Sequence, residues 1–186
     1  MHHAFVRWFL SLSALCAPLL LASCELATNP LLFDGSPLIA NFTVNTTGNS
    51  FSGSNTINLN NVVSGIELDV DSVSVINVSI IIDSLSGGTL ASTTISGTGS
   101  IDGHTLVTLS GVALSTFSSE RSIFDPSLSA AGVTYGSDGI SYVNNMLEHP
   151  ESLPSSTSIA VSGTASQSGL HFKAHIKLYT QVFTHP

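Results

Sequence analysis

The chain has 186 residues, which is enough for one domain with a substantial core. Hydrophobic residues make up 42% of it and charged residues 9%, so the composition argues against an intrinsically disordered chain. The formal net charge is −8, and the only Lys and Arg residues are Arg7, Arg121, Lys173 and Lys177. Because nucleic-acid binding requires a basic surface, we expect no nucleic-acid partner.

The first residues have the pattern of a secretory signal. Met1 to Arg7 contains no acidic residue, and Trp8 to Leu21 is almost wholly apolar. This apolar run is shorter than the roughly 20 residues of a membrane-spanning helix, so we predict a signal peptide over residues 1–23. No second long apolar stretch follows, and we therefore expect no transmembrane helix in the rest of the chain.

The tetrapeptide Leu21-Ala22-Ser23-Cys24 resembles the lipobox of bacterial lipoproteins, with an aliphatic residue, two small residues and a cysteine. The resemblance covers only the amino terminus, and no family is identified for the remainder. It implies that diacylglycerol is transferred to the Cys24 thiol and that the chain is cleaved before Cys24. An ordinary signal with a chance cysteine and a buried core cysteine are the alternatives.

The same resemblance implies a location in the bacterial cell envelope, with the membrane as a partner through the lipid on Cys24. By analogy, an Asp directly after the cysteine favours retention in the inner membrane. Glu25 occupies this position, so the outer membrane is favoured. Cys16 would leave with the signal, and the mature chain would then have no second thiol for a disulfide.

Two prolines, Pro30 and Pro37, separate the segment after Cys24 from the predicted domain. Residues 24–36 are expected to form a tether, because Pro30 and Pro37 interrupt regular structure. Residues 37–186 are then a single domain. It begins with a strand over residues 38–45, where apolar and polar side chains alternate, and residues 51–59 repeat this pattern more weakly.

The segment from residue 66 to residue 82 predicts a strand with an irregularity. Val70 and Val73 lie on opposite parities, and Ile76 returns to the parity of Val70 together with Val78, Ile80 and Ile82. Because a shift of one residue moves side chains to the other face, we expect a bulge or turn near Asp71 and Ser72.

Asp102-Gly103 predicts a hairpin with a type I′ turn, since both residues tolerate positive φ. The expected register pairs Ile101 with His104, Gly99 with Leu106 and Gly97 with Thr108. Near the end of the chain, residues 170–183 alternate as a long strand, which we expect to pair with residues 156–165.

The break between residues 115 and 154 contains one predicted helix, at about residues 139–148. Ser137 or Asp138 is expected to cap its start, and His149-Pro150 to end it. Ile140, Val143, Met146 and Leu147 form its apolar stripe. One short helix among many strands predicts a mainly β fold, an antiparallel β-sandwich with the helix over one end. A β-solenoid is the alternative, although no fixed repeat is found.

The last strand supplies a candidate binding surface. His171, Lys173, His175 and Lys177 share one parity and form the only cationic cluster of an acidic chain. The two histidines are four residues apart, roughly 13 Å on a strand, which is too far for a shared zinc ion. A polar strand face is the simpler interpretation, and a binding surface for an acidic partner or for lipid headgroups is the alternative.

Acidic residues provide two weaker candidates. Glu67, Asp69 and Asp71 alternate and would place three carboxylates on one side of a strand, which is a possible calcium site, although a solvated face is the simpler interpretation. Other titratable residues gather in the long break, where an enzyme based on a carboxylate and a histidine would have its site: Glu120, Arg121, Asp125, Asp138, Glu148 and His149.

The sequence contains no Gly-x-Ser-x-Gly elbow, phosphate-binding loop or dinucleotide fingerprint. We therefore expect no catalytic residue and no cofactor. The expected function is that of a membrane-anchored envelope lipoprotein acting as a non-catalytic structural or binding module. A carrier of an apolar ligand and an envelope hydrolase are the alternatives.

Overall fold

The computed structural model describes residues 31–62, 69–149 and 153–184, which form two antiparallel β-sheets. The first sheet consists of β1 (Leu31–Asp34), β2 (Leu38–Asn45), β4 (Val70–Ser86), β7 (Arg121–Ser122) and β10 (His171–Thr184). The second consists of β3 (Ser50–Asn58), β5 (Thr94–Ile101), β6 (His104–Ala113), β8 (Val133–Tyr135) and β9 (Ser156–Ala165). The helical elements are α2 (Pro126–Ala130), α3 (Ser137–Leu147) and the 3-10 turns η1 (Leu59–Asn61) and η2 (Leu114–Phe117).

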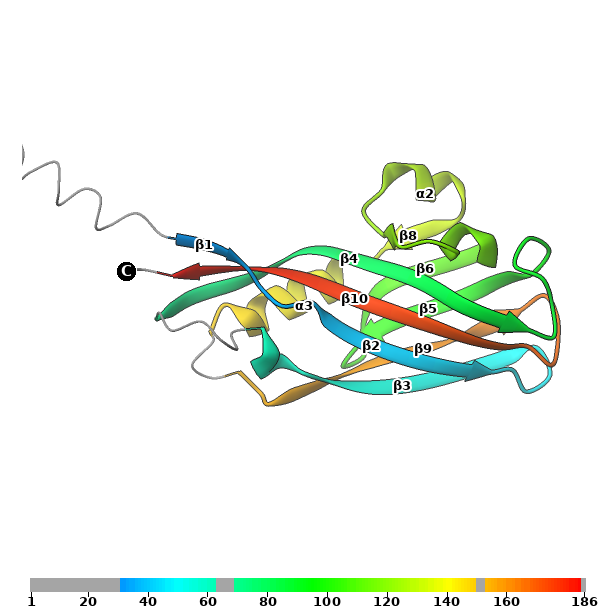
Figure 1. Cartoon of the computed structure of the whole chain (residues 1–186), viewed down its shortest axis with the longest axis horizontal. Helices are drawn as coiled ribbons and strands as arrows, with labels where there is room; N and C mark the ends of the chain where they lie inside the picture. Colours follow the sequence, from blue (N-terminus) through cyan, green and yellow to red (C-terminus); the bar gives the residue numbers. More distant parts are fainter. Residues whose placement is uncertain (1–30, 63–68, 150–152, 185–186) are drawn as a thin grey trace, which may run out of the picture.

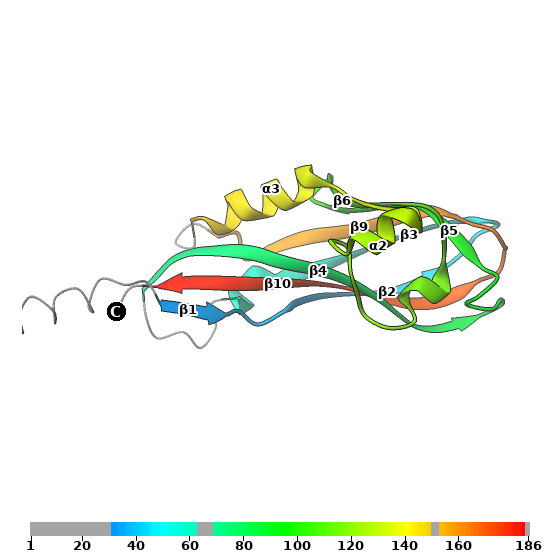
Figure 2. The same ribbon diagram turned by 90° about the horizontal axis from the view of Figure 1, so that it is seen from above.

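The two sheets face each other as a long sandwich, and α3 extends over one end of the first sheet (Figures 1 and 2). In the first sheet β10 lies between β4 on one side and both β1 and β2 on the other. In the second sheet the order is β3, β9, β5, β6, β8. The predicted antiparallel sandwich with a helix over one end is confirmed, and the alternative solenoid is not observed.

The core lies between the sheets and follows from the alternation in the sequence. On β2, Leu38, Ala40, Phe42 and Val44 are buried while the residues between them are exposed. β10 repeats the pattern with the following buried residues: Phe172, Ile176, Leu178 and Val182. A strand with one apolar face buries that face and leaves the other in solvent, and the two sheets meet along these faces.

The pairing of β4 with β10 is interrupted by three bulges in β4. The register skips Asp71, Ile76 and Asp83, each of which has no partner opposite it on β10. The bulge at Asp71 confirms the predicted irregularity. The prediction for Ile76 is wrong, because the second bulge turns its side chain outward to 49% exposure while Val78 remains buried.

The β5–β6 hairpin has the predicted turn and a different register beyond it. Asp102 and Gly103 have φ values of 46° and 90°, and Ile101 pairs with His104 as expected. A shift between Gly99 and Ser100 then pairs Gly99 with Val107 and Gly97 with Leu109, so the expected partners Leu106 and Thr108 are wrong by one residue. The physical reason is a bulge in β6, which two-residue alternation alone does not reveal.

Helix α3 agrees with the prediction except at its start. It begins at Ser137, and its cap residue is Gly136, which makes no side-chain capping bond, so neither Ser137 nor Asp138 is the cap. Val143 and Leu147 are buried and face the sheets, as predicted. Asn144 accepts a hydrogen bond of 2.8 Å from the backbone N–H of Val75, which ties the helix to β4.

Two parts of the chain form structure where none was predicted. β1 lies inside the segment expected as a tether, and it pairs with the last four residues of β10 from Gln181 to Thr184. The long break contains β7, α2 and β8 in addition to α3. Asp125 caps α2 by accepting from the N–H of Ser127.

Candidate functional site

The four basic residues of the predicted binding surface lie on β10 with side chains on the face opposite the core, as alternation requires. His171 and Lys173 are exposed, whereas His175 and Lys177 are half-buried. β2 and β4 flank them on both sides. The tertiary structure divides this set, because the side chains of His175 and Lys177 contact carboxylates from other segments.

Lys177 belongs to a hydrogen-bonded network centred on Glu120. The Lys177 ammonium donates to Glu120 Oε2 over 2.6 Å, and the hydroxyls of Ser79 and Tyr179 both donate to Oε1. The bond from Lys177, followed by those from Ser79 and Tyr179, lowers the pKa of Glu120 to about 2. Glu120 in turn raises the pKa of Lys177 and of Tyr179. This carboxylate therefore holds the segment before β7 on the outer face of β4 and β10.

The imidazole of His175 bridges two strands. Its Nδ1 is hydrogen-bonded to Asn41 on β2 and its Nε2 to Asp83 on β4. Asp83 is the residue that the third bulge leaves without a partner on β10, and this bulge places its carboxylate beside the histidine. Farther along, His171 is bonded to Asn45 of β2. The two histidines thus have separate hydrogen-bonding partners.

Lys173 is the one Lys or Arg in residues 31–62, 69–149 and 153–184 that forms no ion pair, since Arg121 binds Asp125 and Lys177 binds Glu120. It lines a groove of about 190 Å³ with His171 and the polar side chains of Thr43, Ser84 and Ser86. Of the predicted surface, this groove is the part where a cation and hydroxyl groups remain open to a partner.

The residues of the long break do not come together as one site. Glu120 is engaged with Lys177, and Arg121 donates to Asp125 over 2.7 Å and to Ser127 over 3.2 Å. Asp138 lies beside His104 at 3.1 Å, in the first turn of α3, whereas Glu148 and His149 follow the last turn of the same helix. Within the described ranges, no three His, Cys, Asp or Glu side chains form a group suited to a metal ion.

A second polar cluster, which the sequence did not predict, surrounds the β5–β6 turn. The Asp102 carboxylate accepts from the Thr157 hydroxyl, the Ser158 N–H at 3.0 Å and the Tyr142 hydroxyl at 3.2 Å. Burial acts to raise the pKa of Asp102, but these hydrogen bonds outweigh it and the pKa is lowered. The Tyr142 ring stacks on His104 with centroids 4.1 Å apart. One turn residue thereby joins β9 and α3 to the hairpin.

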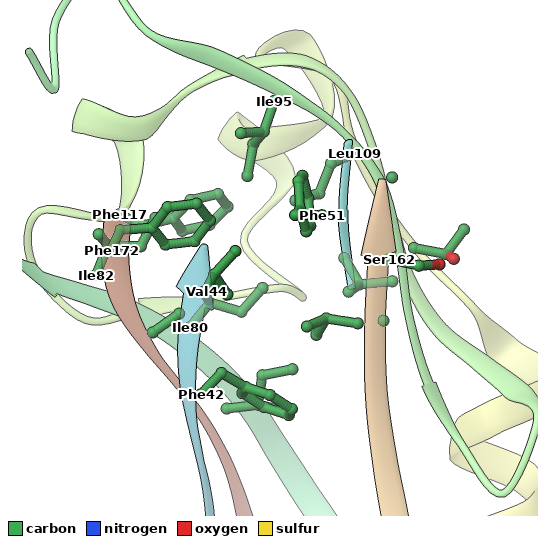
Figure 3. A pocket seen from close by; sticks show the side chains of 17 residues that line it. Phe42, Val44, Phe51, Ile80, Ile82, Ile95, Leu109, Phe117, Ser162 and Phe172 are labelled. Atoms are coloured by element: carbon green, nitrogen blue, oxygen red, sulfur yellow. The ribbon is translucent and has the colours of Figure 1, made fainter. Parts of the chain in front are cut away.

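An apolar cavity of about 50 Å³ lies between the sheets. Figure 3 shows its lining side chains, which come from both sheets and from η2. Aromatic rings provide much of the wall, namely Phe42, Phe51, Phe117 and Phe172. Gly97 and Gly99 of β5 also line it, and the missing side chain of Gly99 leaves room opposite Val107 and Ile176. The chemistry of this lining suits hydrocarbon rather than a polar ligand.

The remaining predicted residues are only partly described. Cys24, the signal peptide and Glu67 lie outside the described residues, while Asp69 and Asp71 are exposed beside or within the start of β4. The calcium prediction therefore stays a prediction. Among the helices that the structure describes, none is long and apolar enough to cross a membrane.

Comparison with known proteins identifies no family. No family model matches the chain, and no curated protein sequence matches it. One solved structure with a similar arrangement is that of a decameric BFDV capsid protein, which is 9% identical in sequence, covers 83% of this chain and 99% of its own, and has a TM-score of 0.34. A likeness of this size carries no argument about function, so the proposals below rest on the chain itself.

Proposed function

We propose that this protein is a membrane-anchored lipoprotein of the bacterial envelope, and that its sandwich domain acts as a non-catalytic binding module. The observation that carries the proposal is the tetrapeptide ending at Cys24 after an apolar run, only seven residues before the start of β1 at Leu31. A lipid on Cys24 would hold the domain at the end where β1 lies.

The anchor is tested by comparing Cys24→Ala with Cys16→Ala in the bacterial host. Cys24→Ala removes the thiol that would receive the lipid, so the protein should leave the membrane fraction. Cys16→Ala is the matched control, because Cys16 would be removed with the signal and its loss should change nothing. Intact-mass analysis should show a chain that begins at Cys24 with acyl mass added. Membrane fractionation of Cys24→Ala equal to that of the wild type contradicts the anchor.

The binding role is supported by the groove around Lys173, which presents a positive charge in a protein of net charge −8. An acidic partner would gain a charge pair there without displacing an internal one. We expect Lys173→Glu to abolish capture of the partner from envelope extracts and Lys173→Arg to retain it. Equal capture by the wild type and Lys173→Glu would place the binding surface elsewhere.

A carrier of an apolar ligand is the second candidate, and the cavity between the sheets is the observation that favours it. Its volume of about 50 Å³ is well below the roughly 300–1,000 Å³ of pockets for drug-sized ligands, so it would admit a small apolar molecule or the end of a chain. Gly99→Ala would put a methyl group 3.0 Å from Val107 Cγ1 and 3.6 Å from Ile176 Cδ1, so Val107 would have to shift slightly and the methyl group would fill part of the space. Binding of xenon or an apolar dye should therefore fall in this variant.

A binding module performs no catalytic step, whereas the remaining alternative, an envelope hydrolase, requires one. Glu148 and His149 are the residues of the long break that stand next to each other at the end of α3. A hydrolytic activity that disappears on mutating these two residues would favour the enzyme over the binding module.

A further inference from the structure

β1 carries an unusual density of exposed apolar surface. Leu31, Leu32 and Phe33 are 42%, 53% and 40% exposed, and they follow one another directly. Isolated exposed apolar side chains are ordinary on a protein surface, but a contiguous group marks a contact with another apolar surface. Half of the large hydrophobic residues that the described chain exposes lie in this one four-residue strand.

The two faces of β1 are both apolar, unlike those of β2. Leu32 pairs with Phe183 and therefore points to the outer face, whereas Leu31 and Phe33 pair with Thr184 and Val182, whose side chains point to the core side. A strand that lies against water on one face alternates apolar and polar residues. β1 does not alternate until Asp34, so apolar surroundings suit both of its faces.

The position of β1 is fixed by its surroundings. It is hydrogen-bonded to β10 along one edge, and the N–H of Gly35 donates to the Thr180 carbonyl over 2.9 Å. A Cβ on Gly35 would lie 2.2 Å from the Thr180 hydroxyl, so the chain passes too close to β10 for a larger residue. Figures 1 and 2 show β1 and the carboxyl-terminal end of β10 together at one tip of the long sandwich.

This tip is also the part of the domain that a lipid on Cys24 would hold nearest the membrane. Leu31 follows Cys24 by seven residues, which span at most about 25 Å when fully extended. Apolar side chains and a lipid anchor on the same short segment would bind one bilayer together, and two membrane signals hold better than one.

We propose that β1 is a membrane-contacting strand, with Leu31, Leu32 and Phe33 inserted among the headgroups and upper acyl chains of the bilayer that holds Cys24. The inference rests on the proposed lipid anchor. Insertion is confined to the side chains, because an open backbone edge is costly in the hydrocarbon interior. A second copy of the chain is the other possible occupant, but pairing of two four-residue strands buries far less than the roughly 1,000 Å² of a stable interface.

The contact would also orient the domain. Lys173 lies eleven residues before Thr184 on β10, roughly 36 Å along the strand from the tip at β1. With β1 seated on the bilayer, the groove around Lys173 is at the far end of the sandwich and faces away from that membrane. A soluble or opposing partner would then reach it more readily than the headgroups beside the anchor.

The test uses the lipidated full chain in phospholipid vesicles with one fluorescent label. The mature protein would have no free thiol, so Leu32→Cys and Ser86→Cys each provide a single site for an environment-sensitive dye. Both positions are exposed, and Ser86 lies at the opposite end of β4 and serves as the matched control. We expect quenching by bilayer-embedded nitroxide lipids to be several-fold stronger at position 32 than at position 86.

Vesicle flotation, measured on the same samples, separates the two proposals. If the protein does not float, the anchor is wrong and the strand contact falls with it. If it floats and the two labels are quenched equally, the anchor stands and the contact is overturned. A blue-shifted label at position 32 that lipids do not quench, together with a doubled mass in detergent, would identify a second copy of the chain as the occupant.

A second variant guards against an effect of the label. Here the dye is attached to Ser36→Cys, just beyond β1, where we expect the spectrum of a membrane environment. Replacing Leu31, Leu32 and Phe33 together by Ser should shift this spectrum to that of a dye in water. Ile39→Ser with Ile76→Ser removes apolar residues of similar exposure from other strands and should leave that spectrum unchanged. Equal effects of the two sets would overturn the assignment to β1.

Discussion

At the scale of single residues, Glu120 connects two strands on the outer face of the first sheet. Its carboxylate accepts from three donors, which lie on β4 and β10. A Lys–Glu pair at a protein surface contributes little by itself, but a carboxylate with several donors is held in one geometry. The interaction therefore fixes the chain between η2 and β7 more than it adds to global stability.

The lowered pKa of Glu120 predicts how stability depends on pH. The carboxyl has a pKa of about 2 in the folded protein against an ordinary 4.5, so its contribution is fully present above 4.5 and is lost as the pH falls toward 2. Glu120→Gln should unfold at lower urea concentration than the wild type above pH 4.5, and the gap should close as the pH falls through this window. A gap that stays constant with pH would show that the ionised network adds nothing to folding.

At the scale of elements, helix α3 provides a hydrogen-bond acceptor for the backbone of β4, as a neighbouring strand would. β7 pairs with β4 only at Ser79 and Ile80, and farther along the Asn144 side chain accepts from the Val75 N–H. A half-buried N–H without an acceptor costs free energy, so the helix has to supply one. The helix thereby completes the hydrogen bonding of the first sheet as well as covering its core face.

Asn144→Ala should lower the free energy of unfolding by about 1 kcal/mol, because it leaves the N–H of Val75 without its partner. Asn145→Ala is the matched control: Asn145 is exposed on the same helix, and the change should stay within about 0.5 kcal/mol. Urea unfolding of the two variants measures the difference. Since both changes replace Asn by Ala on the same helix, they alter helix propensity alike, and equal effects would show that the contact with Val75 adds nothing to stability.

Elements also show how far the sequence alone predicts this fold. β2 and α3 were predicted to within about two residues, since their apolar side chains repeat with the period of a strand and of a helix. The bulges at Ile76 and within β6 were not, because a bulge depends on how two strands fit each other. β1 was missed because its side chains do not alternate.

At the scale of the whole molecule, the two ends of the sandwich differ in chemistry. One tip carries the apolar strand β1, whereas the groove around Lys173 lies at the other end of β10. The buried core begins at Leu38, so β1 stands outside it. The buried core and the proposed membrane contact therefore belong to different parts of the chain.

This separation predicts that a chain starting at Gly35 still folds. Every buried core residue of the described chain lies beyond that point, and β1 adds only a short exposed strand. Far-UV circular dichroism should retain the β-sheet spectrum, and urea unfolding should remain a single cooperative transition. Loss of the cooperative transition would show that β1 belongs to the folding unit.

Patterns within single segments predict local features: the alternation of the strands, the Asp102-Gly103 turn, the apolar stripe of α3 and the proposed anchor at Cys24. Which charged side chains meet follows only from the packing of the folded chain. Asp83 and His175 are far apart in the chain and become neighbours because β4 and β10 pair in a register set by bulges, while Glu120 reaches Lys177 because β7, which directly follows it, pairs with β4. The bulge at Asp71 is visible in the sequence as a change of parity, whereas those at Ile76 and Asp83 depend on how two distant segments pack against each other.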